Sequence, residues 1–410
     1  MNVLILTVGT MGDVAPYTGL GRRLVDAGHD VAIATHDRFA ALVREAGLQF
    51  RSVPTDPATF FDRPDGVSRA RWTVRSSLDY VRATGRDFRR VAEPGADVIL
   101  TSATAAPWAP HIAEAMGVPS MGVYVEAAYA TREFAPFVGR SIGRPLNLAA
   151  GRAVFAVIDA LVAPTVKELR TELGLPPLRP GQLRRRQTAE GWPVCCGFSA
   201  ALLPRPSDWP RGMELVGFWW PEPPAHWEPS DTLTDFLAAG PAPVFVGFGS
   251  VQPDNGEEVG DVIRAALRRN KLRGVVLRGP CEPATDDDLI TIPESRYDRL
   301  FPQVAAVVHA GGAGTTAATL RAGVPSVTVP AVTDQQFWSW RLAEVGASTA
   351  PIPLPRLNAD RLSAALRTVL DRPDHRAAAG RLQARVLAED GAGATVRRLH
   401  ALLDRTRLTD

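Results

Sequence analysis

Residues 307–320 read Val-Val-His-Ala-Gly-Gly-Ala-Gly-Thr-Thr-Ala-Ala-Thr-Leu, an apolar run followed by a glycine turn and then by helix-forming residues. We expect a buried strand that ends at His309 and a helix that begins near Ala313. Glycines let backbone amides approach an anion, and a helix N-terminus carries about half a positive charge. The stretch therefore predicts a phosphate site, although a threonine-capped turn without a ligand has the same pattern. It is neither a P-loop, because no lysine follows the glycines, nor a Gly-x-Gly-x-x-Gly dinucleotide motif.

A second motif follows about twenty residues later, where Val329-Pro330 leads into Thr333-Asp334-Gln335-Gln336. Another strand ends here, and Asp334 and Gln335 open the next helix. A carboxylate and an amide at a strand end can hold two vicinal hydroxyls of a sugar. The structural alternative is that Asp334 only caps the helix from Gln335 to Val345.

Apolar runs of strand length alternate with helical stretches in both halves of the 410-residue chain, which predicts parallel sheets covered on both faces. The length favours two domains. A proline-rich stretch from Trp219 to Pro229 excludes regular structure and indicates a linker. We therefore expect an α/β protein with two facing doubly wound, Rossmann-like domains and a cleft between them. The expected boundaries are 1–217 and 231–390 for the domains, 218–230 for the linker, and 391–410 for a last helix that packs back on the N-terminal domain.

The composition excludes some kinds of binding partner and indicates the cellular compartment. A net charge of +2 is too small to indicate nucleic acid. The cysteines, Cys195, Cys196 and Cys281, form neither a disulfide framework nor a metal motif, and we expect them buried and reduced. No basic leader precedes the first apolar run, and no uninterrupted apolar run of about 18 residues occurs. These features are typical of a cytoplasmic enzyme.

Taken together, residues 308–342 resemble the donor-binding signature of nucleotide-sugar glycosyltransferases with the GT-B fold, especially the vancomycin-group antibiotic glycosyltransferases and the sterol glucosyltransferases. The resemblance extends to Phe248-Gly249-Ser250 and to the stretch from Gly9 to Pro16. It spans both domains and is weak from about Thr55 to Leu203, where such enzymes bind their acceptors.

The resemblance implies a role for each matching residue of the donor site. His309 would contact the α-phosphate, Asp334 and Gln335 would bind the sugar, and Ser295 would lie in the loop beside the base. The diphosphate would be held by residues of three loops: Thr10, Gly12, Ser250, Gly311, Gly312, Ala313, Gly314 and Thr315. Relatives often carry a polar residue at the position of Met11, which cannot neutralise phosphate.

Asp13 is the candidate catalytic base. It follows the first strand on the N-terminal side of the cleft, and an attacking hydroxyl needs a base to take its proton. Many relatives use a histidine near this loop, but here the nearest are His29 and His36, and the antibiotic-type relatives carry aspartate. The alternative is that Asp13 only caps the first helix, and the two roles are compatible.

The acceptor side is less defined. Aromatic residues in the segments that bind acceptors in relatives would suit a flat apolar molecule, although core packing explains them as well: Phe60, Phe61, Trp72, Tyr124, Phe134 and Phe137. The expected helix from Ser68 to Val91 is rich in arginine, typical of a solvated face. An anionic acceptor or a membrane surface is the weaker interpretation.

We therefore expect an inverting, metal-independent glycosyltransferase that moves a sugar from a UDP- or TDP-sugar to a hydroxyl of a natural product, an antibiotic aglycone or a sterol. No cofactor is expected besides this nucleotide-sugar co-substrate. Asp286-Asp287-Asp288 matches the Asp-x-Asp pattern of metal-dependent transferases, but it sits away from any glycine loop and is typical of a solvated acidic loop. The alternatives are a nucleotide-sugar epimerase and a catalytically idle helper of a partner transferase.

Overall fold

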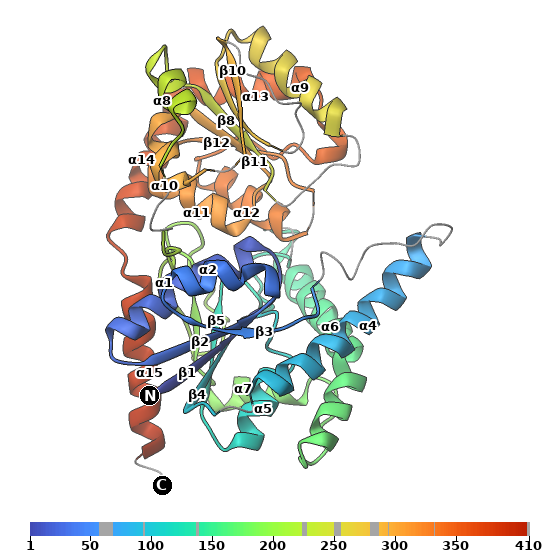
Figure 1. The fold of residues 1–410 in the computed structure, drawn as a ribbon. Coiled ribbons are helices and arrows are strands. Elements are labelled where there is room, and N and C mark those ends of the chain that lie inside the picture. Colours follow the sequence, from blue (N-terminus) through green and yellow to red (C-terminus); the bar gives the residue numbers. More distant parts are fainter. Residues whose placement is uncertain are drawn as a thin grey trace.

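The computed structural model contains two α/β domains stacked one above the other, with the first half of the chain in the lower domain (Figure 1). It describes residues 1–56, 69–92, 95–136, 139–223, 228–249, 256–278, 287–293, 295–331 and 333–407. Ser250, Cys281, Asp286 and the aromatic residues Phe60, Phe61 and Phe137 lie outside the described residues, and so does the side chain of Trp72.

The N-terminal domain is built on a parallel sheet whose strand order, within the described residues, is β3-β2-β1-β4-β5-β6-β7. Its inner strands are buried because helices cover both faces of the sheet, whereas the edge strand β3 is partly exposed. The strands are β1 (Asn2–Leu6), β2 (Asp30–Thr35), β3 (Gln49–Ser52), β4 (Val98–Thr101), β5 (Ser120–Tyr124), β6 (Val194–Cys196) and β7 (Met213–Leu215). The helices are α1 (Met11–Asp26), α2 (Ala40–Glu45), α4 (Arg69–Ala92), α5 (Ala109–Met116), α6 (Arg144–Glu172) and α7 (Gln182–Glu190).

The C-terminal domain has a second parallel sheet, with the order β10-β9-β8-β11-β12 in the described chain. Its strands are β8 (Val244–Gly247), β9 (Gly274–Leu277), β10 (Leu289–Ile292), β11 (Ala306–His309) and β12 (Ser326–Thr328). The helices are α8 (Asp231–Ala238), α9 (Gly256–Arg269), α10 (Tyr297–Leu300), α11 (Ala313–Ala322), α12 (Thr333–Glu344), α13 (Ala359–Asp371) and α14 (Pro373–Leu387). The expected fold of two doubly wound domains is confirmed.

An apolar cluster joins the two domains. Phe198 of the N-terminal domain packs edge-on against Trp338 of α12 with ring centroids 5.3 Å apart, and Leu202 and Leu382 belong to the same buried cluster. Burial of side chains from both domains in one cluster fixes the domains against each other on one side of the interface.

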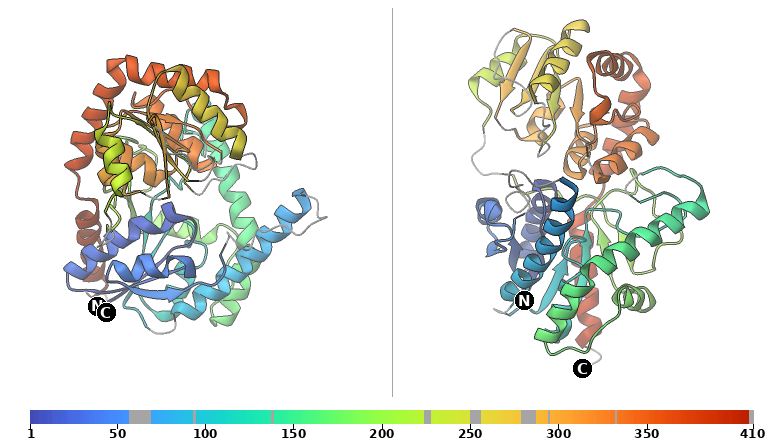
Figure 2. Two further views of the ribbon diagram at one scale, coloured as in Figure 1. Left: turned by 45° about the horizontal axis from the view of Figure 1, so that its top comes forward. Right: turned by 90° about the vertical axis from the view of Figure 1, so that its right-hand side faces the viewer.

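The last helix, α15 (Gly391–Arg407), returns to the N-terminal domain, so both ends of the described chain lie on that domain (Figure 2). Leu399 is fully buried in the same core as Ile5 of β1. The indole of Trp219 donates a hydrogen bond to Thr395 Oγ1 at 3.0 Å. Residues 218–223 between the domains form neither helix nor strand and pack against this helix through Trp219.

Helix α6 has no counterpart in our expectations from the sequence. It is 29 residues long and, by length and composition alone, apolar enough to cross a membrane. Only 11% of its most apolar 18-residue stretch is buried inside the protein. The sequence shows no uninterrupted apolar run here, because α6 contains Arg152, Asp159 and Pro164. Its inner face walls the cavity described below.

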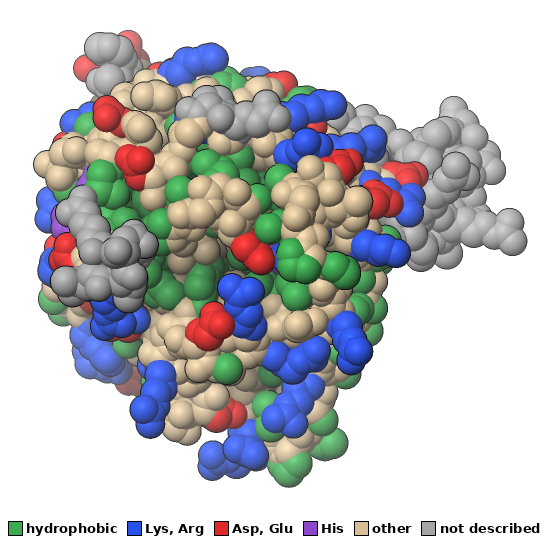
Figure 3. Space-filling model, turned by 90° about the horizontal axis from the view of Figure 1, so that it is seen from below, with side chains coloured by type: hydrophobic (Ala, Val, Ile, Leu, Met, Phe, Trp, Pro, Cys, Tyr) green, Lys and Arg blue, Asp and Glu red, His purple; other side chains and the backbone are tan. Residues whose placement is uncertain are grey.

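The remaining expectations concern the thiols and the surface charge. Cys195 and Cys196 are buried and free in β6, as expected. Seen from below, the N-terminal domain carries basic side chains scattered among acidic and apolar ones (Figure 3).

Candidate active site

The loop between β1 and α1 folds the Asp13 side chain back onto its own turn. Gly9 has φ +138°, and a Cβ there would lie 2.4 Å from Asp13 Oδ2, so only glycine fits. The Thr10 backbone N–H donates to Asp13 Oδ2 at 2.7 Å, and the Thr10 hydroxyl donates to the same oxygen at 3.0 Å. Asp13 therefore completes the N-terminal cap of α1, one of the two roles that its position predicts.

His36 supports this loop from below. Its Nε2 accepts the Gly9 N–H at 3.1 Å, and its Nδ1–H donates to the Val53 carbonyl at 3.3 Å. Burial lowers its pKa, so the ring is neutral. Both ring nitrogens of His36 thus make hydrogen bonds with backbone groups. Asp13 is therefore the side chain beside this loop that can act as a base.

Glu126, which follows β5, is the residue that the sequence analysis missed. Its carboxyl lies within hydrogen-bonding reach of the Asp13 carboxyl. Burial, the charge of Asp13 and the charge of Asp334 raise the pKa of Glu126 well above its ordinary value. Burial also raises the pKa of Asp13, opposed by the hydrogen bonds from Thr10 and Glu126. The available signal was an acidic residue directly after a buried strand, at the sheet edge that also carries Asp13.

The expected phosphate site lies at the turn between β11 and α11. His309 Nδ1 accepts the Gly311 N–H at 3.1 Å, so the neutral ring carries its proton on Nε2. This Nε2 is buried and has no hydrogen-bond partner among the described residues. Burial lowers the pKa of His309 to about 3. Gly311 has φ +87°, and a Cβ there would lie 2.7 Å from the Gln335 carbonyl oxygen, so the turn requires glycine.

The two glycine loops face each other across the domains. A Cβ built on Gly314 would lie 4.0 Å from the Gly12 Cα, so the N-termini of α11 and α1 converge. Gly312 is the N-cap residue of α11 and supplies no side-chain cap, and Ala313 is its first helical residue. Converging helix N-termini create a positive potential between the domains.

Thr315 and Ser295 are the two hydroxyl residues that we expect at the nucleotide. The Thr315 hydroxyl interacts with the Tyr297 hydroxyl, and the Ser295 hydroxyl is buried without a hydrogen-bond partner among the described residues. Thr315 thus lies beside the turn at which we expect the nucleotide, and Ser295 precedes Tyr297 by two residues in the chain.

Asp334 and Gln335 start α12 on the same side of the cleft. Asp334 is exposed, and partial desolvation followed by the charge of Asp13 raises its pKa. The Gln335 amide oxygen accepts the Ala331 N–H at 2.9 Å, which commits this oxygen to the turn. The charges of Asp13 and Asp334 raise the pKa of Glu126, and the charge of Asp13 raises that of Asp334, so the three carboxyl groups form one acidic cluster.

A cavity of about 320 Å³ leads away from this cluster into the N-terminal domain. Glu126, Asp334 and Tyr124 line it at the cleft. Apolar side chains from both domains form most of its wall: Phe155, Ile158, Val162, Val166, Leu178, Phe337 and Trp338. Phe134, expected to bind the acceptor, is buried behind this wall, with its ring edge-on to Phe337 at 5.1 Å.

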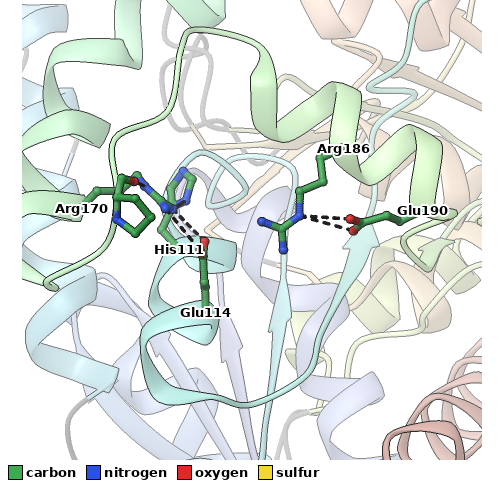
Figure 4. A network of polar contacts seen from close by, with 6 residues as sticks. His111, Glu114, Arg170, Arg186 and Glu190 are labelled. Carbon is green, nitrogen blue, oxygen red and sulfur yellow. Dashed lines mark hydrogen bonds and ion pairs between the residues drawn. The ribbon is translucent and has the colours of Figure 1, made fainter. Parts of the chain in front are cut away.

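An ion pair lies next to His111, which lines the cavity (Figure 4). Buried Arg170 of α6 contacts Glu114 of α5 at 2.7 Å and donates to His111 Nδ1 at 2.9 Å. His111 also lines the cavity, and burial with the Arg170 charge lowers its pKa to about 4. On α7, Arg186 pairs with Glu190 at 3.2 Å.

Each domain matches a known protein family. Residues 3–135 match the glycosyltransferase family 28 N-terminal domain, and residues 292–402 match the erythromycin biosynthesis protein CIII-like C-terminal domain. The chain is 33% identical over 411 residues to an O-mycaminosyltylonolide 6-deoxyallosyltransferase of Streptomyces fradiae, covering 95% of each chain. It is 30% identical over 428 residues to a sterol 3-beta-glucosyltransferase of Arabidopsis thaliana, covering 98% of this chain and 68% of that protein.

Solved structures agree on the fold. The calicheamicin glycosyltransferase superposes with a TM-score of 0.71 at 18% identity over 98% of each chain. The glycosyltransferase VinC, solved with dTDP, superposes with a TM-score of 0.70 at 20% identity over 99% of this chain and 100% of that one. With its two matching domains and a full-length relative, the chain belongs to the GT-B glycosyltransferases, in the group that joins a family 28 N-terminal domain to an EryCIII-like C-terminal domain.

Proposed function

We propose that this glycosyltransferase moves a sugar from a UDP- or TDP-sugar to a hydroxyl of a hydrophobic small molecule, a natural-product or antibiotic aglycone or a sterol, with inversion at the anomeric carbon. The observation that carries the proposal is the pairing of two unlike sites across one cleft. A neutral histidine with an unsatisfied N–H lies at a helix N-terminus of the C-terminal domain, and Asp13 and Glu126 lie on the N-terminal domain, with Glu126 lining an apolar cavity.

The donor diphosphate is assigned to the turn before α11. His309 Nε2–H donates to the α-phosphate, and the amides from Gly311 to Thr315 meet the remaining charge. Thr10 and Gly12 approach from the opposite loop, and Ser250 is assigned to the same group by resemblance alone. Asp334 and Gln335 bind the sugar, and Ser295 lies beside the base.

Asp13 is assigned as the general base. The acceptor oxygen forms a bond to the anomeric carbon from the face opposite the diphosphate, while the bond from that carbon to the phosphate oxygen breaks. The electron pair leaves with the diphosphate, and the hydroxyl proton passes to Asp13. One displacement converts an α-linked donor into a β-linked product.

The acceptor is assigned to the cavity. Its apolar wall and volume of about 320 Å³ suit a hydrophobic molecule, whose hydroxyl would approach Glu126 and Asp13 at the cleft. By their names, the relatives described above act on O-mycaminosyltylonolide and on sterols, which supports the same acceptor class. The diphosphate is stabilised by amides, hydroxyls and His309, so the proposed chemistry requires no metal.

The test is a turnover assay of the purified chain with UDP- and TDP-sugars and a panel of macrolide and sterol acceptors, with product linkage read by NMR. We expect acceptor-dependent release of nucleoside diphosphate and a β-linked product from an α-linked donor. Conversion of the donor without an acceptor would instead establish the epimerase alternative. Nucleotide binding without turnover on any acceptor would favour the idle helper.

A further inference from the structure

Asp13 and Glu126 are both partly buried, with Glu126 Oε2 fully buried, and their carboxyl groups lie within hydrogen-bonding reach of each other. A carboxylate can only accept hydrogen bonds, so two ionised carboxylates would repel each other here. A proton shared between them removes the repulsion and turns the contact into a hydrogen bond. The question is which of the two residues carries it.

The surroundings assign the proton to Glu126. Asp13 Oδ2 already accepts two hydrogen bonds from Thr10, and Asp13 lies in the first turn of α1, both of which favour its charged form. Glu126 Oε2, by contrast, is buried and receives no hydrogen bond from a donor in the described parts of the chain. A buried, ionised oxygen without donors is costly, whereas a protonated one can donate to Asp13.

We propose that Glu126 is a positioning residue that stays protonated and donates its carboxyl hydrogen to Asp13, holding Asp13 charged and oriented for the acceptor hydroxyl. This inference rests on the proposed function, in which Asp13 is the base. Before the reaction the pair carries one proton. When Asp13 takes the acceptor's proton, both carboxyls are neutral, and the pair returns one proton to solvent after the product leaves.

The other titratable groups around the pair do not perform this switch. His36, behind the loop, is kept neutral by burial, and Tyr17 of α1 and Tyr124 of β5 have pKa values raised well above the ordinary value by burial. Asp334 of α12 adds a negative charge that raises the proton affinity of Glu126. The pair should therefore work between two limits: activity falls at low pH when Asp13 is protonated and at high pH when Glu126 loses its proton.

The test compares wild type with Glu126→Gln and Glu126→Ala across pH. Glutamine imitates the protonated acid, since its amide donates a hydrogen bond but does not titrate. We expect Glu126→Gln to keep kcat/KM within about threefold at the optimum and to lose the alkaline limb of the profile. Glu126→Ala should lose about tenfold at the optimum, as expected for one missing hydrogen bond to a charged group.

Thermal unfolding supplies a readout that does not depend on turnover. Because folding raises the pKa of Glu126, its proton stabilises the folded chain at low pH, and this contribution is lost as pH rises through the folded value. The Tm of wild type should therefore fall relative to that of Glu126→Gln as pH rises. If Glu126→Ala does not fold, the glutamine variant decides alone.

Two results would overturn the inference. A loss of a hundredfold or more in Glu126→Gln would make ionised Glu126 the base, and parallel pH profiles of activity and of Tm in wild type and Glu126→Gln would make its role merely structural. Absence of transfer by wild type would instead reject the proposed function, and the Tm comparison would still decide whether Glu126 holds the proton.

Discussion

The two glycine loops that meet in the cleft have the same local backbone structure but serve different purposes. Each follows a buried strand, turns through a glycine with positive φ and opens a helix whose N-terminus faces the other domain. At α1 the chain provides its own anion, because Asp13 accepts the Thr10 N–H. At α11 the N-cap is Gly312, and no side chain caps the turn.

This difference explains why the two loops have different roles in the proposed reaction. A helix N-terminus that already holds a carboxylate has little affinity left for phosphate, and Met11 at the first position of α1 is exposed and apolar. The N-terminus of α11 keeps its amides and the buried His309 Nε2–H for an external anion. The first loop is thus suited to hold a base and the second to hold a diphosphate, and the predictions below test this division.

The largest expected effect is at the first loop. Asp13→Asn keeps the size of the side chain and an oxygen for the Thr10 N–H, but it cannot take a proton. General-base assistance is worth roughly 10²- to 10⁴-fold, so kcat should fall by that factor while Tm and nucleotide affinity barely move. Asp13→Ala is the matched variant, which should in addition lower stability by about 1 kcal/mol through loss of the cap. Near-normal kcat in Asp13→Asn would leave Asp13 a cap only.

At the second loop, His309→Ala should weaken binding of UDP or TDP at least tenfold. A hydrogen bond to a charged group contributes about 1.5–3 kcal/mol, and the variant removes the Nε2–H donor. Isothermal titration calorimetry measures the change. His375→Ala is the control, because this histidine of the same domain contacts the Gly346 carbonyl and is not assigned to the donor. Equal affinities for wild type and His309→Ala would remove the phosphate from this turn.

A smaller and more selective effect is expected from Asp334→Ala. If its carboxylate binds the sugar, kcat/KM should fall about tenfold, by one hydrogen bond to a charged group. Affinity for free nucleoside diphosphate should stay within about twofold, because that ligand lacks the sugar. Calorimetry and steady-state kinetics on the same preparation measure both quantities. Parallel losses in the two assays would show that Asp334 serves α12 as a cap.

The sequence predicted the second loop better than the first. The turn from Val307 to Thr315 is local, so glycine spacing and strand period place His309 at the strand end and Ala313 at the helix start, as found. The loop that carries Asp13 is equally local in sequence. The partner of Asp13, Glu126, is 113 positions away in the chain and meets it through strand order, which no single-sequence pattern specifies.

The acceptor region was predicted least well for a related reason. Helix α6 is apolar on the side that lines the cavity and also on exposed positions such as Leu146 and Val157, so it lacks the clear periodicity of an amphipathic helix. Phe134 was expected at the acceptor because it is aromatic, but it packs between Trp209 and Phe337. Aromatic residues fill cores and line pockets alike, and only the packing separates the two.

The smallest expected effect is that of removing divalent cations, which should not change the reaction rate. If the turn before α11 meets the whole charge of the leaving diphosphate, a divalent cation has no part in the reaction, and the initial rate should be the same in excess EDTA as in Mg²⁺ or Mn²⁺. The reason is physical: the amides, the helix N-terminus and His309 Nε2–H are already oriented and need no rearrangement when negative charge develops. A metal-dependent transferase assayed in the same buffer would show that chelation is complete. A rate that vanishes in EDTA and returns with Mg²⁺ would mean that α11 binds the donor but does not by itself stabilise its departure.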